Sequence, residues 1–208
     1  GTSTSTGTAS RSPTPSTSVS AAPSQTTPHS GFIHRADTVF AVGDVHGAYD
    51  ELIALLRGNN LIDADNEWSG GTAHLVSLGD LLDRGANSRA VMDLFRRLQL
   101  EAHAAGGRVH VLLGNHEVMN LTGDLRDVSD AEFAAFAEGV VQPAKETANR
   151  SNATPPKPKG YTQHRRAFAP EGDYGRWLLS LPLMVRINDT VYAHGGLSPL
   201  LGNRTLAE

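Results

Sequence analysis

Four short polar motifs hold most of the side chains in this sequence that could do chemistry. Each follows an apolar run and contains glycine, and any one of them alone is typical of an ordinary turn after a strand. The motifs are GDVHG at 43–47, GDLLDRG at 79–85, GNHE at 114–117 and HGG at 194–196. Together they supply eight candidate site residues: Asp44, His46, Asp80, Asp83, Arg84, Asn115, His116 and His194.

The residue types in these motifs predict a metal site. Carboxylates gathered at one place repel one another and need positive charge nearby. The sequence contains no cysteine, so the ligands would be oxygen and nitrogen atoms, a donor set that suits Mn²⁺, Fe or Zn²⁺. Two divalent ions about 3.5–4 Å apart can share one carboxylate. We therefore expect two divalent metal ions.

Strands that alternate with helical stretches must position these motifs. The apolar runs VFAV, HLVSL and VHVLL precede the first three motifs, and the helical stretches AYDELIALLRGNN and NSRAVMDLFRRLQLEAHAAGG follow the first two. This alternation predicts an α/β fold with a parallel sheet whose strands are buried on both faces. Ligands of such sheets bind beyond the carboxyl ends of the strands, where the motifs lie.

The rest of the chain divides into a linker, a domain and a cap. Residues 1–34 are rich in Ser, Thr, Pro and Ala, which predicts a disordered linker, and 35–208 form the predicted domain. Within the domain, about 121–176 departs from the alternation and predicts a cap over the strand ends. Its expected parts are helices at SDAEFAAFAEGVV and EGDYGRWLLSLP, separated by the Pro-rich loop TANRSNATPPKPKG. The segment LMVRINDTVYAHGGLSP then predicts a hairpin that leads to His194.

The composition indicates which binding partners and which cellular location to expect. The formal net charge is -4 and the pI is near 6.1, which argues against a general nucleic-acid partner. No apolar segment reaches the roughly 18–20 residues needed to span a bilayer. A tether of the composition found in 1–34 favours a periplasmic or secreted protein over a cytoplasmic one.

In this order, the four motifs resemble the phosphoprotein phosphatases of the calcineurin-like metallophosphoesterase superfamily. GNHEVMNLTGDLR and RINDTVYAHGGLSP further resemble the Shewanella-like, bacterial-type branch, and the resemblance covers about 38–201. It implies a two-sheet α/β/β/α sandwich. The related diadenosine tetraphosphatases typically carry Gln and Ala where this sequence has His46 and Asp83, so these two residues favour the protein phosphatase branch.

The resemblance also implies the metal ligands. Asp44 and His46 would bind the first ion, and Asp80 would bridge both ions. Asn115 and His194 would bind the second ion. Mn²⁺ is favoured over Fe and Zn²⁺ as the metal.

The catalytic roles are implied in the same way. Arg84 would hold the phosphate oxygens, with Asn115 beside it, and His116 would protonate the leaving oxygen while Asp83 orients it. A metal-bound hydroxide would attack phosphorus directly, without a covalent phosphoenzyme. Glu117 is expected to have a structural role, either fixing the turn by hydrogen bonding or neutralising a neighbouring Arg.

The sequence departs from the family pattern in one respect. The pattern includes a further metal-binding His and a second phosphate-binding Arg after the HGG motif, and no His follows His194 here. We therefore expect a C-terminally truncated piece of a longer phosphatase with an incomplete second sheet. Its second ion would lack one protein ligand unless water or an upstream residue such as His164 replaces it.

The expected function is that of a metallophosphatase, a hydrolase acting on phosphoprotein or phosphopeptide esters, with phosphotyrosine favoured over phosphoserine and phosphothreonine. Two alternatives remain open. One is a nucleotide pyrophosphohydrolase of the diadenosine tetraphosphatase type. The other is a non-catalytic module that binds phosphate because the last metal-ligand His is missing.

The remaining histidines are expected to be structural or exposed. His74 and His110 begin strands and are interpreted as structural residues, and His103 is interpreted as lying on the solvated face of a helix. The HRR segment at 164–166 is interpreted as a solvent-facing loop, with contact to phosphate as the alternative.

Overall fold

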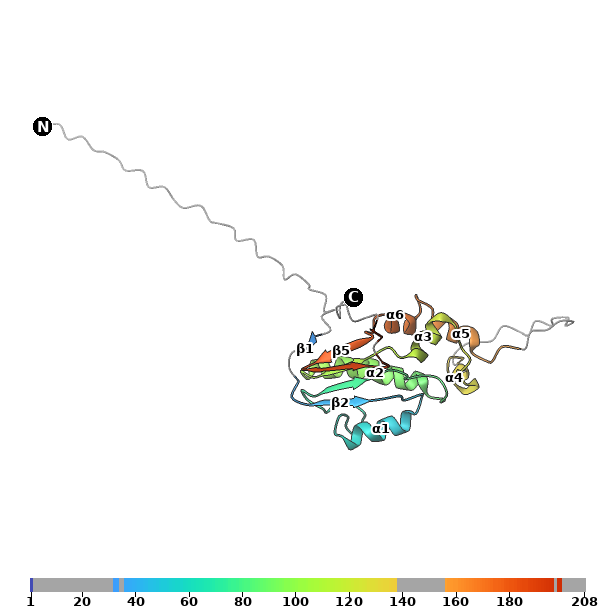
Figure 1. The fold of residues 1–208 in the computed structure, drawn as a ribbon, viewed down its shortest axis with the longest axis horizontal. Helices are drawn as coiled ribbons and strands as arrows, with labels where there is room; N and C mark the ends of the chain where they lie inside the picture. The colour runs from blue at the N-terminus through green and yellow to red at the C-terminus, as the bar shows by residue number, and fades with distance from the viewer. Residues whose placement is uncertain (2–31, 34–35, 138–155, 197, 200–208) are drawn as a thin grey trace.

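The computed structural model describes residues 1, 32–33, 36–137, 156–196 and 198–199 (Figure 1). Most of the predicted linker and of the Pro-rich loop falls outside these residues, as does everything after 199. The described end of the predicted linker contains the short strand β1 (Phe32–Ile33).

A parallel sheet positions the first three motifs. Its strands are in the order β2 (Val39–Val42), β3 (His74–Ser77) and β4 (Arg108–Val111), and neighbouring strands are parallel. This confirms the predicted alternation. The prediction that the strands are buried on both faces is correct only for β3, the central strand. The outer strands β2 and β4 each have an exposed position.

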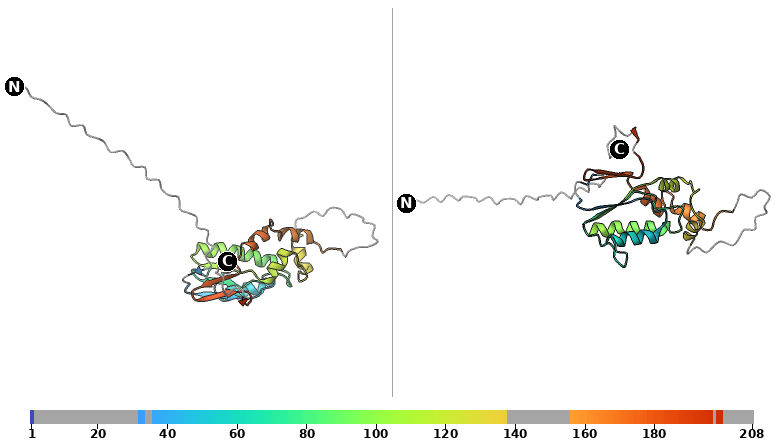
Figure 2. Two further views of the ribbon diagram at one scale, coloured as in Figure 1. Left: turned by 45° about the horizontal axis from the view of Figure 1, so that its top comes forward. Right: turned by 60° about the horizontal axis from the view of Figure 1, so that its bottom comes forward.

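Two amphipathic helices cover one face of this sheet, as the right panel of Figure 2 shows. Helix α1 (Tyr49–Gly58) buries Leu52, Ile53 and Leu56, a spacing that places the three side chains on one face. Helix α2 (Ser88–Ala104) contributes the buried residues Val91, Met92, Leu94, Phe95, Leu98 and Ala102. These side chains pack with Leu75, Val109 and Val111 of the sheet in the main core.

A second, smaller sheet covers the other face. It has the order β1, β5 (Met184–Ile187) and β6 (Thr190–Ala193); β5 is parallel to β1 and antiparallel to β6. Asn188, with φ of 54°, and the following Asp189 form the predicted turn of the β5–β6 hairpin. A separate core cluster of Val76, Leu112, Val185 and Ile187 lies between the sheets. The described residues thus form helix, sheet and sheet layers of the predicted sandwich.

Four short helices gather at one end of the parallel sheet (Figure 1). They are α3 (Asn115–Thr122), α4 (Asp130–Ala135), α5 (Tyr161–Ala167) and α6 (Asp173–Leu179). The predicted helix starts are confirmed for α4, where the Ser129 hydroxyl accepts from Glu132 N at 3.1 Å, and for α6. None of the helices in the described part of the chain has the length and apolar character needed to cross a membrane.

The prediction of a solvent-facing loop at 164–166 is wrong. These residues lie in α5, and the side chain of His164 is fully buried. Its ring stacks on Phe168 at 4.5 Å between centroids and meets Phe133 and Phe136 edge-on. Aromatic packing therefore orders a segment whose charged sequence suggested a loop.

The main core gives a direct test of this packing. Phe95→Ala removes a side chain that is fully buried under the sheet, so we expect the free energy of unfolding to fall by about 3–5 kcal/mol. Leu100→Ala, in the same helix but at a position that is 74% exposed, should change it by less than about 0.5 kcal/mol. Urea unfolding followed by circular dichroism measures both, and similar losses would contradict the assigned faces of α2.

Candidate metal and phosphate site

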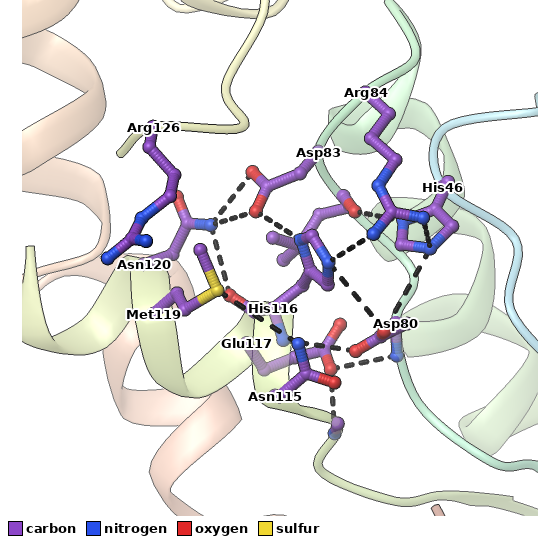
Figure 3. A network of polar contacts seen from close by, with 12 residues as sticks. His46, Asp80, Asp83, Arg84, Asn115, His116, Glu117, Met119, Asn120 and Arg126 are labelled. Carbon is purple, nitrogen blue, oxygen red and sulfur yellow. Dashed lines mark hydrogen bonds and ion pairs between the residues drawn. The ribbon is translucent and has the colours of Figure 1, made fainter. Parts of the chain in front are cut away.

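The four motifs meet at the carboxyl ends of β2, β3, β4 and β6, as predicted, and Figure 3 shows the side chains of the second and third motifs with His46. The first turn docks on the second through backbone bonds, because Val45 N and His46 N donate to Asp80 O at 3.0 and 2.9 Å. Gly85 permits this contact, since a Cβ there would overlap the carbonyl oxygen of His46.

Several site residues have strained backbones. His46, Asp80, Asp83 and Arg84 all have positive φ, at 45°, 53°, 70° and 65°. Residues other than glycine rarely adopt this region, which costs about 1–3 kcal/mol for each residue, and such strain clusters at functional sites. The surrounding contacts must therefore hold the turns in place.

Asp80 lies at the centre of the site. Its Oδ1 accepts from His116 N at 3.0 Å. Its Oδ2 faces three imidazoles, with distances to Nε2 of 3.4 Å for His194 and 3.9 Å for both His46 and His116. Asp44 Oδ2 lies 3.8 Å from His46 Nε2 on the exposed side. The Asp80 carboxylate thus belongs to two groups of side chains in the described residues that could hold a metal ion, one with His46 and His116 and the other with Asp44 and His194, each with its ligand atoms within 4.8 Å of one another.

The tautomers of two imidazoles fit metal binding. His46 Nδ1 lies 3.0 Å from Leu82 O, and His194 Nδ1 lies 3.0 Å from Leu78 O. A carbonyl oxygen only accepts, so each Nδ1 carries a hydrogen and a neutral ring directs the lone pair of Nε2 at the site. Metal-ligating histidines typically show this arrangement.

Asn115 adds an oxygen to the same group. Its Oδ1 lies 3.0 Å from His194 Nε2. With Nδ1 protonated on a neutral ring, both of these atoms are acceptors, and a shared cation removes the conflict between them. The structure therefore brings together all five predicted metal ligands, and their donor types fit a divalent ion.

A buried pair lies behind the metal ligands. His116 Nδ1 donates to Asp83 Oδ2 at 2.8 Å, and both side chains are excluded from solvent. Asn120 Nδ2 contacts both Asp83 oxygens at 2.9 Å (Figure 3). Burial raises the pKa of Asp83, and the hydrogen bonds from Asn120 and His116 oppose this shift. Sequence reasoning missed Asn120, although it lies one helical turn after His116.

Arg84 lies across the two imidazoles that flank Asp80. Its Nη1 donates to His46 Nε2 at 3.0 Å and its Nη2 donates to His116 Nε2 at 3.2 Å (Figure 3). The guanidinium thus presents its planar fork within the same cluster as the predicted metal ligands. Such a fork matches two phosphate oxygens.

Glu117 has the structural role predicted for it. Its Oε2 accepts from Asp80 N at 2.9 Å and Gly114 N at 2.7 Å, and its Oε1 accepts from Leu81 N at 2.8 Å. Burial raises its pKa, and the three backbone N–H groups oppose that shift. Of the two alternatives, fixing the turn is the correct one.

The other histidines of the described residues, His74, His103, His110 and His164, lie outside the site. His164 is enclosed by aromatic rings in the cap and belongs to neither ligand group among the described residues, so its proposed use as a substitute ligand is wrong. His74 begins β3 as predicted, but His110 is the third residue of β4, so the prediction that it begins a strand is wrong. His110 Nε2 lies 3.4 Å from His74 Nδ1, and burial lowers the pKa of His110 to about 4. His103 is exposed, as predicted.

Comparison with known proteins identifies the class. The model of the calcineurin-like phosphoesterase family matches residues 38–207, and the chain therefore belongs to that family. It is similar to Shewanella-like protein phosphatase 1 of Plasmodium berghei, with 32% identity over 169 residues that make up 81% of this chain and 41% of the relative. Shewanella-like protein phosphatase 2 of Arabidopsis thaliana is 29% identical over 78% of this chain and 47% of its own length.

A solved structure agrees with these relatives. The cold-active protein-tyrosine phosphatase of a psychrophilic Shewanella superposes with a TM-score of 0.64 and 35% identity, over 83% of this chain and 48% of that one. The chain thus spans about half the length, or less, of these relatives.

The turn at Gly114 depends on two acceptor oxygens at 117. Glu117→Gln keeps the size of the side chain but turns an NH₂ group toward backbone donors, so we expect the free energy of unfolding to fall by about 1.5–3 kcal/mol. Glu51→Gln, an exposed carboxylate in α1, is the matched control. Equal midpoints for the two variants in urea unfolding would contradict the role assigned to Glu117.

Proposed function

We propose that this domain is a metal-dependent phosphomonoesterase that hydrolyses phosphoprotein or phosphopeptide esters. One observation carries the proposal: the buried His116–Asp83 pair opens onto the cluster around Asp80, with Arg84 3.2 Å from His116 Nε2. An acid, an anion-binding fork and a set of metal ligands thus face one another. The phosphatase names of the relatives support the same conclusion.

The metal ligands would divide into two groups. Asp44 and His46 would hold one ion, Asn115 and His194 the other, and Asp80 would serve both. Oxygen and imidazole ligands favour Mn²⁺, with Fe and Zn²⁺ as alternatives. When bound, such ions supply positive charge toward phosphate oxygens and activate water as a nucleophile.

Arg84 binds the phosphate in this proposal. Its two terminal nitrogens lie 3.0 and 3.2 Å from imidazole nitrogens, where they would instead contact two oxygens of the phosphoryl group. Charge-assisted, bidentate bonds of this kind fix orientation as well as adding affinity. The side chain of Asn115, which lies beside His194, would contribute to the same phosphate pocket.

His116 acts as the general acid. Asp83 holds Nδ1 and thereby directs Nε2 into the cluster, and Asn120 holds both oxygens of Asp83. For protonation of the leaving oxygen, Nε2 must carry the proton, so Arg84 must contact phosphate rather than this nitrogen. A positioned imidazole of this type contributes about a hundredfold or more to rate.

The names of the relatives indicate which phosphate esters to test first. One relative of known structure is named a protein-tyrosine phosphatase, so a phosphotyrosyl peptide is the preferred substrate, ahead of phosphoseryl and phosphothreonyl peptides. Diadenosine tetraphosphate tests the alternative class of nucleotide pyrophosphohydrolase. Faster cleavage of the dinucleotide than of any phosphopeptide would reject the phosphomonoesterase assignment.

Metal binding and turnover can be measured on one sample. After Mn²⁺ loading, we expect two equivalents of metal per chain and hydrolysis of p-nitrophenyl phosphate. Asp80→Asn should lose both equivalents together, because one carboxylate serves two ions, whereas the exposed Asp50→Asn should retain them. Two full equivalents in Asp80→Asn would refute the bridging role, and phosphate binding without turnover in the wild-type chain would favour a non-catalytic module.

The acid is tested separately. His116→Ala should lower kcat about a hundredfold or more with metal content unchanged, as expected when a general acid is lost. His103→Ala, an exposed histidine of α2, should leave kcat unchanged. Unchanged kcat in His116→Ala would remove this residue from the mechanism.

A further inference from the structure

The cap contains a buried acid that the proposed mechanism does not use. Glu132 in α4 is fully excluded from solvent, and neither of its carboxyl oxygens has a hydrogen-bond partner among the described residues. Burying a carboxyl group without partners is costly, and the cost is much greater for the charged form. The position of Glu132 therefore requires an explanation.

The local sequence indicates a position for this side chain that would cost less free energy. Ser129 and Glu132 form the S-x-x-E pattern of a capping box, in which the glutamate would bond the backbone N–H of the serine near the surface. The Ser129 half of the box forms, since its hydroxyl accepts from Glu132 N at 3.1 Å. The Glu132 carboxyl is turned into the interior instead.

In the interior, Glu132 lies near the loop that carries Asp83 and Arg84. Arg84 N donates to Asp127 O at 2.9 Å, and the Ser129 hydroxyl lies 3.2 Å from Gly85 O. The segment 127–132 is thus fixed along the loop from 83 to 88.

The carboxyl group of Glu132 lies close to two residues of this loop, Asp83 and Ser88. The backbone N–H of Asp83 and the hydroxyl of Ser88 face the Glu132 carboxyl and favour its ionised form. Neither makes a hydrogen bond with it, because Asp83 N donates to the Ser88 hydroxyl at 3.1 Å.

The charged groups around Glu132 favour its uncharged form. Burial, reinforced by the charge of Asp83, raises the pKa of Glu132 to about 8. On the other side, His164 Nε2 lies 4.0 Å from Glu132 Oε1, and burial with the nearby Arg165 lowers the pKa of His164 to about 4. Near neutral pH both buried groups are therefore uncharged.

We propose that Glu132 is a positioning residue for the His116–Asp83 pair, and that it acts as a protonated, uncharged carboxylic acid. Its side chain packs beside the Asp83 N–H and the Ser88 hydroxyl that holds it, without adding a second negative charge. Asp83 then remains the charged partner of His116. The role in catalysis rests on the proposed function, because it takes His116 as the general acid.

A stability measurement tests the protonation state without any need for turnover. Because the folded pKa of about 8 exceeds the ordinary value of 4.5, the stability that the neutral acid provides is lost as pH rises from about 4.5 to 8. The difference in Tm between Glu132→Gln and the wild type should therefore change in favour of the variant by about 3 °C or more as pH rises from 4.5 to 8. Above pH 8 this difference should stay constant.

The exposed Asp130→Asn, in the same helical turn, is the matched control and should show a difference from wild type that does not change with pH. A Glu132→Gln difference that is likewise independent of pH would overturn the proposal. It would show that Glu132 is ionised in the folded protein at neutral pH.

Two further measurements test whether Glu132 is coupled to Asp83 and His116. In NMR titrations, the backbone amide of Asp83 and the ring protons of His116 should show a step near pH 8 in the wild type and in Asp130→Asn, and no such step in Glu132→Gln. Absence of that step from the wild type would refute the coupling even in a chain that shows no turnover.

With p-nitrophenyl phosphate, we expect wild-type kcat to decline above pH 8, and Glu132→Gln should keep kcat within about twofold at pH 7 and lack that decline. KM should be unchanged. An identical alkaline decline in both proteins would reject a positioning role, whereas a wild-type protein without turnover would reject the proposed function and leave the NMR step to decide the role of Glu132.

Discussion

The site depends on one carboxylate, that of Asp80, held where three imidazole nitrogens and a strained backbone converge. Its φ of 53° is unfavourable for a residue with a side chain, so the position must be fixed by its neighbours. Glu117 accepts from its N–H, the 43–47 turn donates to its C=O, and its Oδ1 accepts from His116 N. Gly114 is required beside it, because a Cβ at Gly114 would overlap Asp80 Oδ1. Three of the four motifs are therefore bound together at this residue.

The two aspartates of the 79–85 motif have different environments and therefore different proposed roles. Asp80 directs a free oxygen toward Nε2 atoms of His46, His116 and His194, as a metal ligand would. Asp83, only three residues later, is fully buried, and its oxygens are occupied by hydrogen bonds from His116 and Asn120. Positive φ at both residues turns the chain sharply enough to separate the two side chains. The strained turn thus places two carboxylates close in sequence in two distinct electrostatic roles.

Sequence patterns predicted the features that follow from the local succession of strands, turns and helices. They failed where contacts between residues far apart in sequence determine the structure. The parallel sheet and the convergence of the motifs follow from alternation and from the rule that ligands bind at strand ends. The helix at 161–167 escaped detection because it is short and is held by Phe133, Phe136 and Phe168 rather than by its own periodicity. The inward orientation of Glu132 also contradicts the capping box that its sequence indicates, and the carboxyl group lies instead near Asp83 and Ser88, which are far away in sequence.

Hydrogen bonds connect the cap to the loop that carries Arg84 and to the helix that carries His116. The backbone N–H of Arg84 is bound by Asp127, Gly85 O is contacted by the Ser129 hydroxyl, and Arg165 Nη1 donates to Asn120 O at 2.7 Å, at the end of the helix that carries His116. Displacement of α4 or α5 would therefore shift Arg84 and His116 together. Because well-packed interiors transmit such shifts rather than absorb them, residues in the cap that never touch substrate can still control the alignment of His116 and Arg84.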